Sequence, residues 1–264
     1  MILTILGSGT SQGVPTIGCR CRVCQSSDGR DHRLRSSAMV EWDGMRVVID
    51  AGPDFRAQML REGVRHIDAL LLTHEHKDHT GGIDDTRAFN FVDYPIVHRL
   101  QLYSHRATLE TVRKDYHYAF VENKYTGVPE IDLHEVELGS TFRVCSEDGS
   151  REVEVVSIAG GHSERFEVMG FRFGDVAYLT DFKTIADGEV AKLMGLKVLV
   201  VNALRWTDHY SHFCVREAID LINRVKPERA YLTHMSHDIG LFDEASAKLP
   251  EGVELAYDGL KIEI

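Results

Sequence analysis

The run LLLTHEHKDH limits most strongly how this chain can fold. Residues 67–73 are apolar enough to predict a buried strand, and His74, His76, Asp78 and His79 follow directly after it. Side chains two apart lie on one side of an extended chain, whereas the last two ligand-type residues come after the chain turns into a helix. Imidazole and carboxylate groups are ligands for transition metals, including Zn and Mn. The spacing therefore predicts a loop shared by two metal ions, with a histidine-rich surface turn as the alternative.

Three further predicted strands end in the same residue types. SIAGGH ends in His162, VAYLTD in Asp181 and RAYLTH in His234. Each alone is a weak signal, because an aspartate after a strand commonly belongs to a cap or a turn. Together with the first cluster they make seven candidate ligands, about the number that two cations need when water fills the remaining positions.

Strand and helix patterns alternate along the rest of the chain. The predicted helices are 54–63, 215–225 and a segment near 241–248, and the predicted strands are 2–7, 37–42, 45–50, 67–73, 153–159, 166–173, 176–180, 196–204, 229–233, 253–257 and 260–264. We expect one α/β (α+β) domain over residues 1–264, with mixed sheets and outer helices. Residues 98–140 have the least regular pattern and are expected to form an irregular insertion.

Composition excludes several other classes of protein. The net charge of −11, from 30 basic and 41 acidic residues, argues against a nucleic-acid partner. Five cysteines, an odd number, argue against a secreted disulfide framework. The start MILTILGSGT has no basic segment before its short apolar run, and no apolar stretch approaches a membrane span. These features lead us to expect a cytoplasmic protein with no membrane partner.

Three of the cysteines lie within six residues, in the run GCRCRVCQ. Cys19, Cys21 and Cys24 cannot all pair with one another, and three thiolates are one ligand short of a closed tetrahedral zinc site. Cys145 and Cys214 have no ligand-type neighbours in the sequence and are expected to be buried as small apolar residues. The cluster in residues 18–25 is therefore either part of a zinc site or a loop of reduced thiols.

The ordered set of histidines and aspartates resembles the full ligand set of the metallo-β-lactamase superfamily. That resemblance implies an αββα sandwich with a dinuclear site at one edge, and it extends over essentially the whole chain. By position it implies one metal held by His74, His76 and His162, the other by Asp78, His79 and His234, and Asp181 bridging the two. Asp50, in VVIDAGPD, matches an aspartate that supports the metal loop. True β-lactamases usually have cysteine at the bridging position, which argues against antibiotic hydrolysis.

The start GSGTSQGVPTIGCRCRVC is similar to one branch, the phosphoribosyl 1,2-cyclic phosphate phosphodiesterases of phosphonate breakdown. This resemblance implies a structural zinc held by Cys19, Cys21, Cys24 and His237, the last of these lying three residues after His234. It also implies a homodimer. The glycine-rich start lacks the Lys-Ser/Thr ending of a phosphate-binding P-loop.

Two divalent ions, Zn or Mn, would lower the pKa of a shared water, so that a metal-bridged hydroxide could attack phosphorus. An alkoxide leaving group then needs a proton. His212, in ALRWTDHYSHF, matches the branch's general acid by its offset from His234; His209 is the fallback, and a surface role for His212 is the alternative. Asp78 is counted as catalytic as well as a ligand. Arg205 suits either a phosphate or a surface salt bridge.

The predicted function is metal-dependent hydrolysis of a small or cyclic phosphodiester, such as a phosphoribosyl cyclic phosphate or a nucleotide-like compound. Residues 116–132 are a candidate for part of the pocket wall. A tRNA 3′-processing nuclease shares the metal core, but its long basic arm has no counterpart in this sequence. A non-enzymatic relative of the pyrroloquinoline quinone biosynthesis protein shares the cysteine cluster, but that branch has lost ligands that are all present in this chain.

Overall fold

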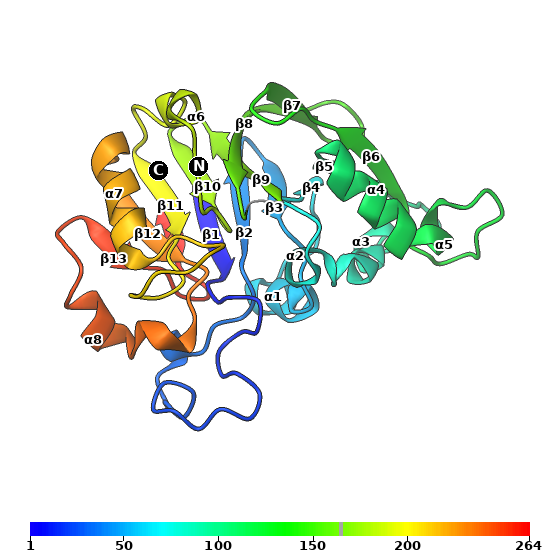
Figure 1. Cartoon of the computed structure of the whole chain (residues 1–264). Coiled ribbons are helices and arrows are strands. Elements are labelled where there is room, and N and C mark those ends of the chain that lie inside the picture. The colour runs from blue at the N-terminus through cyan, green and yellow to red at the C-terminus, as the bar shows by residue number, and fades with distance from the viewer. Residues whose placement is uncertain (164–165) are drawn as a thin grey trace.

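Two mixed β-sheets stacked face to face form the centre of the molecule. The structure, a computed structural model, describes residues 1–163 and 166–264. Each sheet has seven strands, and helices cover both outer faces (Figure 1). This architecture is the αββα sandwich, so the predicted fold class is confirmed.

Each sheet combines strands from neighbouring and from distant parts of the chain. In order across the sheet, the first consists of β14 (Lys261–Glu263), β1 (Ile2–Gly7), β2 (Ser37–Trp42), β3 (Met45–Ile49), β4 (Ala69–Leu71), β5 (Leu100–Ser104) and β6 (Ile131–Glu135). The second, in the same way, consists of β13 (Val253–Leu255), β12 (Arg229–Thr233), β11 (Val198–Asn202), β10 (Val176–Leu179), β9 (Glu167–Phe173), β8 (Glu152–Gly161) and β7 (Thr141–Cys145).

Helices connect the strands and cover the sheets. The α-helices are α1 (Phe55–Glu62), α2 (Lys77–Thr80), α3 (Arg87–Asn90), α4 (Arg106–Asp115), α5 (His117–Phe120), α6 (Asp187–Ala191), α7 (Val215–Val225) and α8 (Phe242–Ser246). Short 3-10 turns are η1 (Gly29–Asp31), η2 (Ile83–Thr86) and η3 (His237–Ile239). No helix in the described ranges is long and apolar enough to cross a membrane.

The alternation of side chains along each strand builds three apolar layers. In β3, Val47 and Ile49 point into the core between the sheets, whereas Val48 points towards the helices over the first sheet. In β10, Tyr178 points into the central core and Leu179 towards the helices over the second sheet. Because successive strand side chains face opposite sides, strands that are apolar throughout have to be covered on both faces.

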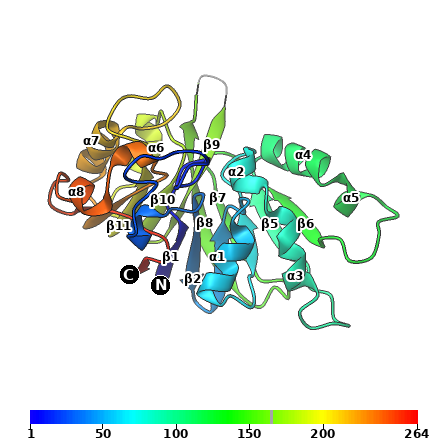
Figure 2. The same ribbon diagram turned by 90° about the horizontal axis from the view of Figure 1, so that it is seen from below.

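Helix α7 shows how the outer layers form. Its buried side chains, Val215, Ala218, Leu221, Ile222 and Val225, are three or four residues apart and therefore share one face. They belong to the apolar cluster that covers the second sheet. Figure 2 shows α6, α7 and α8 on one side of the molecule and α1, α3 and α4 on the other.

Parallel strands give the sandwich one edge where several strands end together. Strands β3 to β6 are parallel in the first sheet, and β10 to β13 are parallel in the second. The carboxyl ends of parallel strands meet at one edge, which is where open α/β sheets bind ligands. The ends of β4, β10 and β12 carry candidate metal ligands, so a metal site is expected at this edge of the sandwich.

The buried carboxylate of Asp258 fixes the chain as it leaves β1. It accepts hydrogen bonds from the Ser8 amide at 2.9 Å, the Ser8 hydroxyl at 2.8 Å and the Leu34 amide at 2.8 Å. Burial raises the pKa of Asp258, and these donors act against that shift. Strand β1 also pairs with β14 at one end of the first sheet, so residues near both ends of the described chain lie side by side.

The segment 98–140 is more regular than the sequence pattern suggested. It contains β5, α4, α5 and β6, and both strands are paired members of the first sheet. Strand β6 lies at the outer end of that sheet and has one buried residue followed by half-buried ones. A half-buried edge strand lacks the strong apolar run by which central strands are recognised, which explains the wrong expectation.

We expect Phe171→Ala to lower the free energy of unfolding by about 3–5 kcal/mol. Phe171 is fully buried between the sheets, and its truncation leaves a cavity there. Tyr125→Ala is the matched control, because 82% of Tyr125 is exposed, and it should change stability by less than about 0.5 kcal/mol. Urea unfolding of both variants measures the difference, and equal effects would contradict the placement of the core.

Candidate metal centres

All seven strand-end residues predicted as ligands converge on one edge of the sandwich, and together they supply overlapping groups of nitrogen and oxygen atoms within 4.8 Å of one another. Asp181 and His234 have positive φ angles of 64° and 56°, and so does Asp50 at 63°. Non-glycine residues seldom adopt this conformation, and they concentrate at functional sites. Three turns directly after strands therefore share one unusual backbone shape.

The first group consists of His74, His76 and His162. Nε2 of His74 lies 3.0 Å from Nδ1 of His76, and the His162 ring centroid lies 5.1 and 5.0 Å from theirs. Nδ1 of His162 donates a hydrogen bond to the Ser211 carbonyl at 2.9 Å, which leaves its Nε2 without the proton. Three imidazoles with convergent nitrogens fit one zinc-type cation.

The second group lies around His79. Its Nε2 is 3.1 Å from Asp78 Oδ2 and 3.2 Å from Asp181 Oδ2, and Nδ1 of His234 is 3.2 Å from the same Asp181 oxygen. Nε2 of His79 is buried and has no hydrogen-bond partner among the described residues. A buried nitrogen facing two carboxylates without a hydrogen bond fits a bound cation between them.

Asp181 connects the two groups. Its carboxylate forms candidate sets with His74 and His79, with Asp78 and His234, and with His162 and His212. A carboxylate with two oxygens can bind one cation through each of them. The placement fits the bridging role that the resemblance implied.

Asp50 orients the ring of His79 from behind. Its Oδ2 accepts a hydrogen bond from His79 Nδ1 at 2.7 Å, and its Oδ1 accepts one from the Thr73 amide at 2.8 Å. The proton is thereby held on Nδ1, and Nε2 is directed at the candidate site. Gly52 lets the turn after Asp50 lie close to Asp78, since a Cβ at residue 52 would lie 1.9 Å from the Asp78 carbonyl oxygen.

Burial and charge set the protonation of the buried histidines. Burial lowers the pKa of His74 well below its ordinary value and that of His234 to about 3, so both are neutral, as metal ligands must be. Burial acts the same way on His79, but Asp78, Asp181 and Asp50 outweigh it and raise that pKa well above the ordinary value. Negative charge is thus concentrated around His79, where a second cation would offset it.

The two histidines predicted as proton donors lie beside the first group. Nε2 of His212 is 3.0 Å from Asp181 Oδ1, and its Nδ1 is 3.2 Å from Nδ1 of His209. The Ser211 hydroxyl lies 3.0 Å from His212 Nδ1. His212, predicted as the general acid, therefore contacts a candidate metal ligand directly.

The cysteine cluster has the fourth ligand that the resemblance implied. Nδ1 of His237 lies 3.3 Å from Cys19 Sγ, 3.5 Å from Cys21 Sγ and 3.3 Å from Cys24 Sγ. A tetrahedral zinc with Zn–S bonds of about 2.3 Å and Zn–N bonds of about 2.0 Å separates such atoms by about 3.5 Å. The Cys3His group thus has the dimensions of a closed zinc site.

The chemistry of the thiols also suits a metal. The Cys24 amide donates a hydrogen bond to Cys21 Sγ, which lowers the pKa of that thiol to about 6. Burial raises the pKa of Cys24 to about 11, so its deprotonation needs a cation. Leu241 packs against the cluster, and Arg22 pairs with Glu244 at 2.5 Å, so the N-terminal loop is fastened to the segment around α8.

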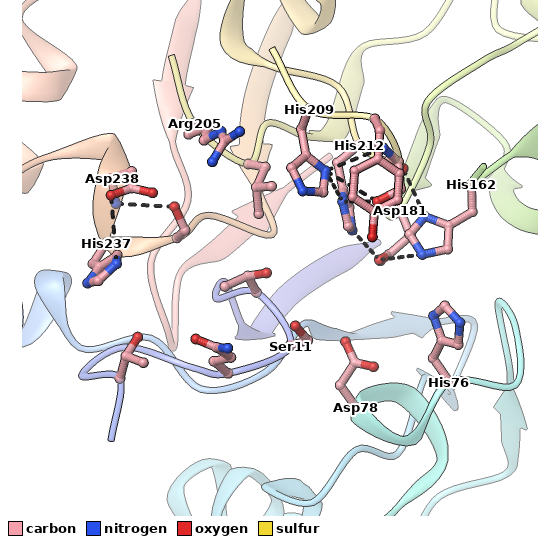
Figure 3. A pocket seen from close by; sticks show the side chains of 17 residues that line it. Ser11, His76, Asp78, His162, Asp181, Arg205, His209, His212, His237 and Asp238 are labelled. Carbon is pink, nitrogen blue, oxygen red and sulfur yellow. Dashed lines mark hydrogen bonds and ion pairs between the residues drawn. The ribbon is translucent and has the colours of Figure 1, made fainter. Parts of the chain in front are cut away.

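A cavity of about 440 Å³ lies between the histidine and aspartate groups on one side and the Cys3His group on the other. Figure 3 shows His76, Asp78 and His162 on one side of it, and His237 and Asp238 on the other. The wall between them includes Arg205, His209, Tyr210, His212 and the Thr10–Gln12 loop. The size is that of a small-ligand pocket. Residues 116–132 do not line this pocket, contrary to expectation.

Two hydroxyl residues at the site were not expected from the sequence. Ser36 Oγ lies 3.0 Å from Nδ1 of His234, and Thr10 Oγ1 lies 3.3 Å from its Nε2. Ser36 lies in a polar stretch with no recognisable motif. Thr10 lies in the glycine-rich start, three residues after the end of β1, and no motif marked it.

The αββα sandwich thus carries, at one edge, buried histidine and aspartate groups that could hold metal ions. Residues 45–235 match the family model described as a beta-lactamase superfamily domain. The chain belongs to the beta-lactamase superfamily.

One crystal structure that is similar over the whole chain is that of "a new diphosphatase from the PhnP family". It is 40% identical, with a TM-score of 0.89, over 100% of this chain and 97% of that one. Zn²⁺-bound PqqB from Methylobacterium extorquens shares the fold, with 21% identity and a TM-score of 0.78 over the full length of both chains.

Among curated proteins, an octanoyltransferase from Porphyromonas gingivalis is 40% identical over 260 residues, which are 97% of this chain and 50% of that protein. Coenzyme PQQ synthesis protein B from Methylorubrum extorquens is 40% identical over 97 residues, covering 31% of this chain and 32% of that protein. The chain therefore spans half or less of the length of these curated relatives.

We expect Cys19→Ser to remove one zinc equivalent and to lower Tm by about 5–10 °C, because binding energy at a structural site is also folding energy. Cys145→Ser is the control, since Cys145 lies outside the Cys3His group. Metal analysis of protein purified without chelators, combined with thermal melts, tests this. If no metal is lost from Cys19→Ser relative to the parent protein, the zinc assignment is wrong.

Proposed function

We propose that the protein is a dinuclear metal-dependent phosphodiesterase that hydrolyses a small or cyclic phosphodiester. The observation that carries the proposal is the shared position of Asp181 between a three-histidine group and the buried Nε2 of His79, which faces two carboxylates without a hydrogen bond. Two cations held there would polarise the phosphate and lower the pKa of a bound water towards neutral pH. The proposed metals are Zn or Mn at this site and Zn at the Cys3His group.

In this proposal His74, His76 and His162 hold one cation, Asp78, His79 and His234 hold the other, and Asp181 is shared. The Asp50 carboxylate keeps the His79 proton on Nδ1. Ser211 performs the same task for His162 through its carbonyl oxygen. These contacts hold a proton on Nδ1 of each of the two rings and so direct Nε2 of His79 and of His162 at the candidate sites.

We assign the proton for the leaving oxygen to Nε2 of His212. This atom is hydrogen-bonded to Asp181 Oδ1 at 3.0 Å, and His212 lines the pocket. It therefore reaches both the candidate metal site and the space available to a substrate. His209, whose Nδ1 lies 3.2 Å from Nδ1 of His212, is placed to pass a proton to it from the open side of the pocket.

The resemblance to a PhnP-family diphosphatase supports attack on phosphorus with loss of an oxygen leaving group, which diesters and diphosphates have in common.

Human tRNase Z shares the fold at 18% identity, and the net charge of −11 disfavours a tRNA substrate. The PQQ-type binding function is disfavoured because this chain has all seven ligand residues. The octanoyltransferase is twice as long as the matched region, so acyl transfer forms no part of the proposal. The proposal does include a small-molecule substrate and a homodimer.

We expect Asp181→Ala to leave the protein folded but to reduce both metal content and activity. A shared ligand holds the cations together and offsets their repulsion, so hydrolysis of bis(p-nitrophenyl) phosphate with Mn or Zn should fall by more than about 100-fold. Asp187→Ala on exposed α6 is the control. Near-parental hydrolysis by Asp181→Ala, with metal retained, would show that the cations are not held in this way.

Substitution of His212 and of His209 should have different effects on different leaving groups. His212→Ala should cost about 10²–10⁴-fold on a diester with an alkoxide leaving group, and far less on a p-nitrophenyl diester, whose leaving group needs little protonation. Metal content should stay constant. His209→Ala should be milder on both substrates.

Other outcomes would reassign the roles. If the two variants exchange behaviour, His209 is the acid. Loss of a metal from His212→Ala would make His212 a ligand, as its contact with Asp181 allows. Equal losses on both substrates would indicate that His212 binds phosphate.

A further inference from the structure

The loop that carries the three cysteines is fastened mainly by the Cys3His group. In the described structure, the backbone hydrogen bonds of residues 15–25 all stay within this loop. Among the described residues, its polar contacts with later parts of the chain are those of the sulfur atoms with Nδ1 of His237 and the ion pair of Arg22 with Glu244. More than half of each side chain in that pair is exposed, and exposed ion pairs stabilise little. Chemistry at the cysteines would therefore loosen the whole loop.

The same loop borders the pocket. Thr16 and His237 both line the cavity, and Figure 3 shows His237 on the side opposite His76 and Asp78. His237 also lies three residues after His234, a candidate ligand. The Cys3His group thus connects the loop to a segment that supplies both a ligand and part of the pocket wall.

The three thiols differ in their access to solvent. Cys19 and Cys21 are half-buried, whereas Cys24 is 8% exposed. Cysteine binds metals as the thiolate, which is also the form that reacts with oxidants. A metal-bound thiolate that solvent can reach, such as that of Cys21, therefore meets the conditions for oxidation.

The backbone brings Cys21 and Cys24 together in one turn. The Gln25 amide donates a hydrogen bond to the Cys21 carbonyl at 3.1 Å, and the Cys24 amide donates one to Cys21 Sγ at 3.4 Å. Residues three apart in a turn have their Cα atoms within about 7 Å, a distance that a disulfide can span. The ligand atoms of the group lie within 4.8 Å of one another, so rotation of the two side chains can join these sulfur atoms. Cys19 has a single residue between itself and Cys21, and so short a ring strains the disulfide geometry.

We propose that Cys21 and Cys24 form an oxidation site, at which hydrogen peroxide converts the two thiolates to a disulfide, abolishes the zinc site and releases residues 15–25 from the pocket wall. The proposal concerns a covalent modification of the protein itself. It goes beyond the proposed function and does not depend on the identity of the substrate.

The reaction takes two steps that balance. Cys21 Sγ attacks one peroxide oxygen, so that an S–O bond forms, the O–O bond breaks and the other oxygen leaves as water after taking a proton from solvent. Cys24 Sγ then attacks the sulfur of this sulfenic acid, so that the S–S bond forms, the S–O bond breaks and a second water leaves after a second proton is taken up. The two thiolates lose two electrons in all, and the peroxide gains them.

The disulfide removes half of the zinc ligands. Cys19 and His237 remain, two of the four ligands that a closed zinc site needs. Because binding energy at such a site is folding energy, loss of the metal frees the loop. The candidate ligands of the dinuclear site include no cysteine, so the metals that they hold should stay in place.

The test treats the zinc-loaded parent protein, purified without chelators, with increasing amounts of hydrogen peroxide. Metal analysis after desalting measures the zinc that is lost, and alkylation followed by mass spectrometry maps the disulfide in the same sample. We expect the loss of one zinc equivalent in proportion to a Cys21–Cys24 disulfide. Dithiothreitol with added zinc should restore both the thiols and the metal.

Hydrogen exchange measures the release of the loop. After oxidation the amides of residues 15–25 should exchange more than about 10-fold faster, whereas those of β12 should not change. Cys145→Ser, which removes a half-buried thiol outside the Cys3His group, is the matched control and should behave as the parent protein does.

Retention of zinc in excess peroxide would overturn the proposal, as would zinc loss without a Cys21–Cys24 disulfide. Zinc loss that dithiothreitol and zinc do not reverse would show oxidative damage in place of the disulfide reaction. Unchanged exchange of residues 15–25 would contradict the release of the loop. All these measurements need no substrate, so they decide the proposal even if the protein does not hydrolyse bis(p-nitrophenyl) phosphate, the result that would count against the proposed function.

Discussion

Everything in this structure depends on bringing several histidines and aspartates together at one edge, away from water. Burying such groups costs free energy unless each is hydrogen-bonded, paired or bound to a cation. The sandwich meets this demand with rigidity: the ligands follow strands whose apolar faces are covered on both sides, and three turn residues adopt positive φ angles. Asp50 and Ser211 then fix the rings of His79 and His162. Nε2 of His79 and the shared carboxylate of Asp181 then face candidate positions for cations.

The parts that could be predicted from sequence are those with a local signal. Helix α7 was predicted with the bounds that the structure gives, because its apolar residues repeat every three or four positions. The ligands were recognisable because histidine and aspartate directly after an apolar strand are conspicuous within a few residues. His237 was reached through the family resemblance, and the three sulfur atoms around its Nδ1 agree with that inference.

The parts that could not be predicted depend on contacts between distant residues. Ser36 and His234 are 198 positions apart, and His212 and Asp181 are 31 apart, so no local pattern connects them. Strand β6 was missed because a half-buried edge strand has a weak apolar pattern, and strand β5 because Gln101 interrupts its short apolar run. The fully buried Arg33, whose guanidinium nitrogens have no hydrogen-bond partner among the described residues, gave no signal either, and the carboxylate that pairs with it is Asp31 at 3.5 Å.

The hydrogen bonds of Asp258 impose an order on folding. Ser8 lies 250 residues before its partner, so the loop that follows β1 cannot be fixed until the polypeptide near Asp258 has been synthesised. Closing so large a loop costs entropy before the contact gives any stabilisation, and chains that depend on such contacts fold slowly. A chain interrupted before residue 234 would lack His234 and His237, one member of each candidate metal site, so neither ligand set is complete until translation has passed this point.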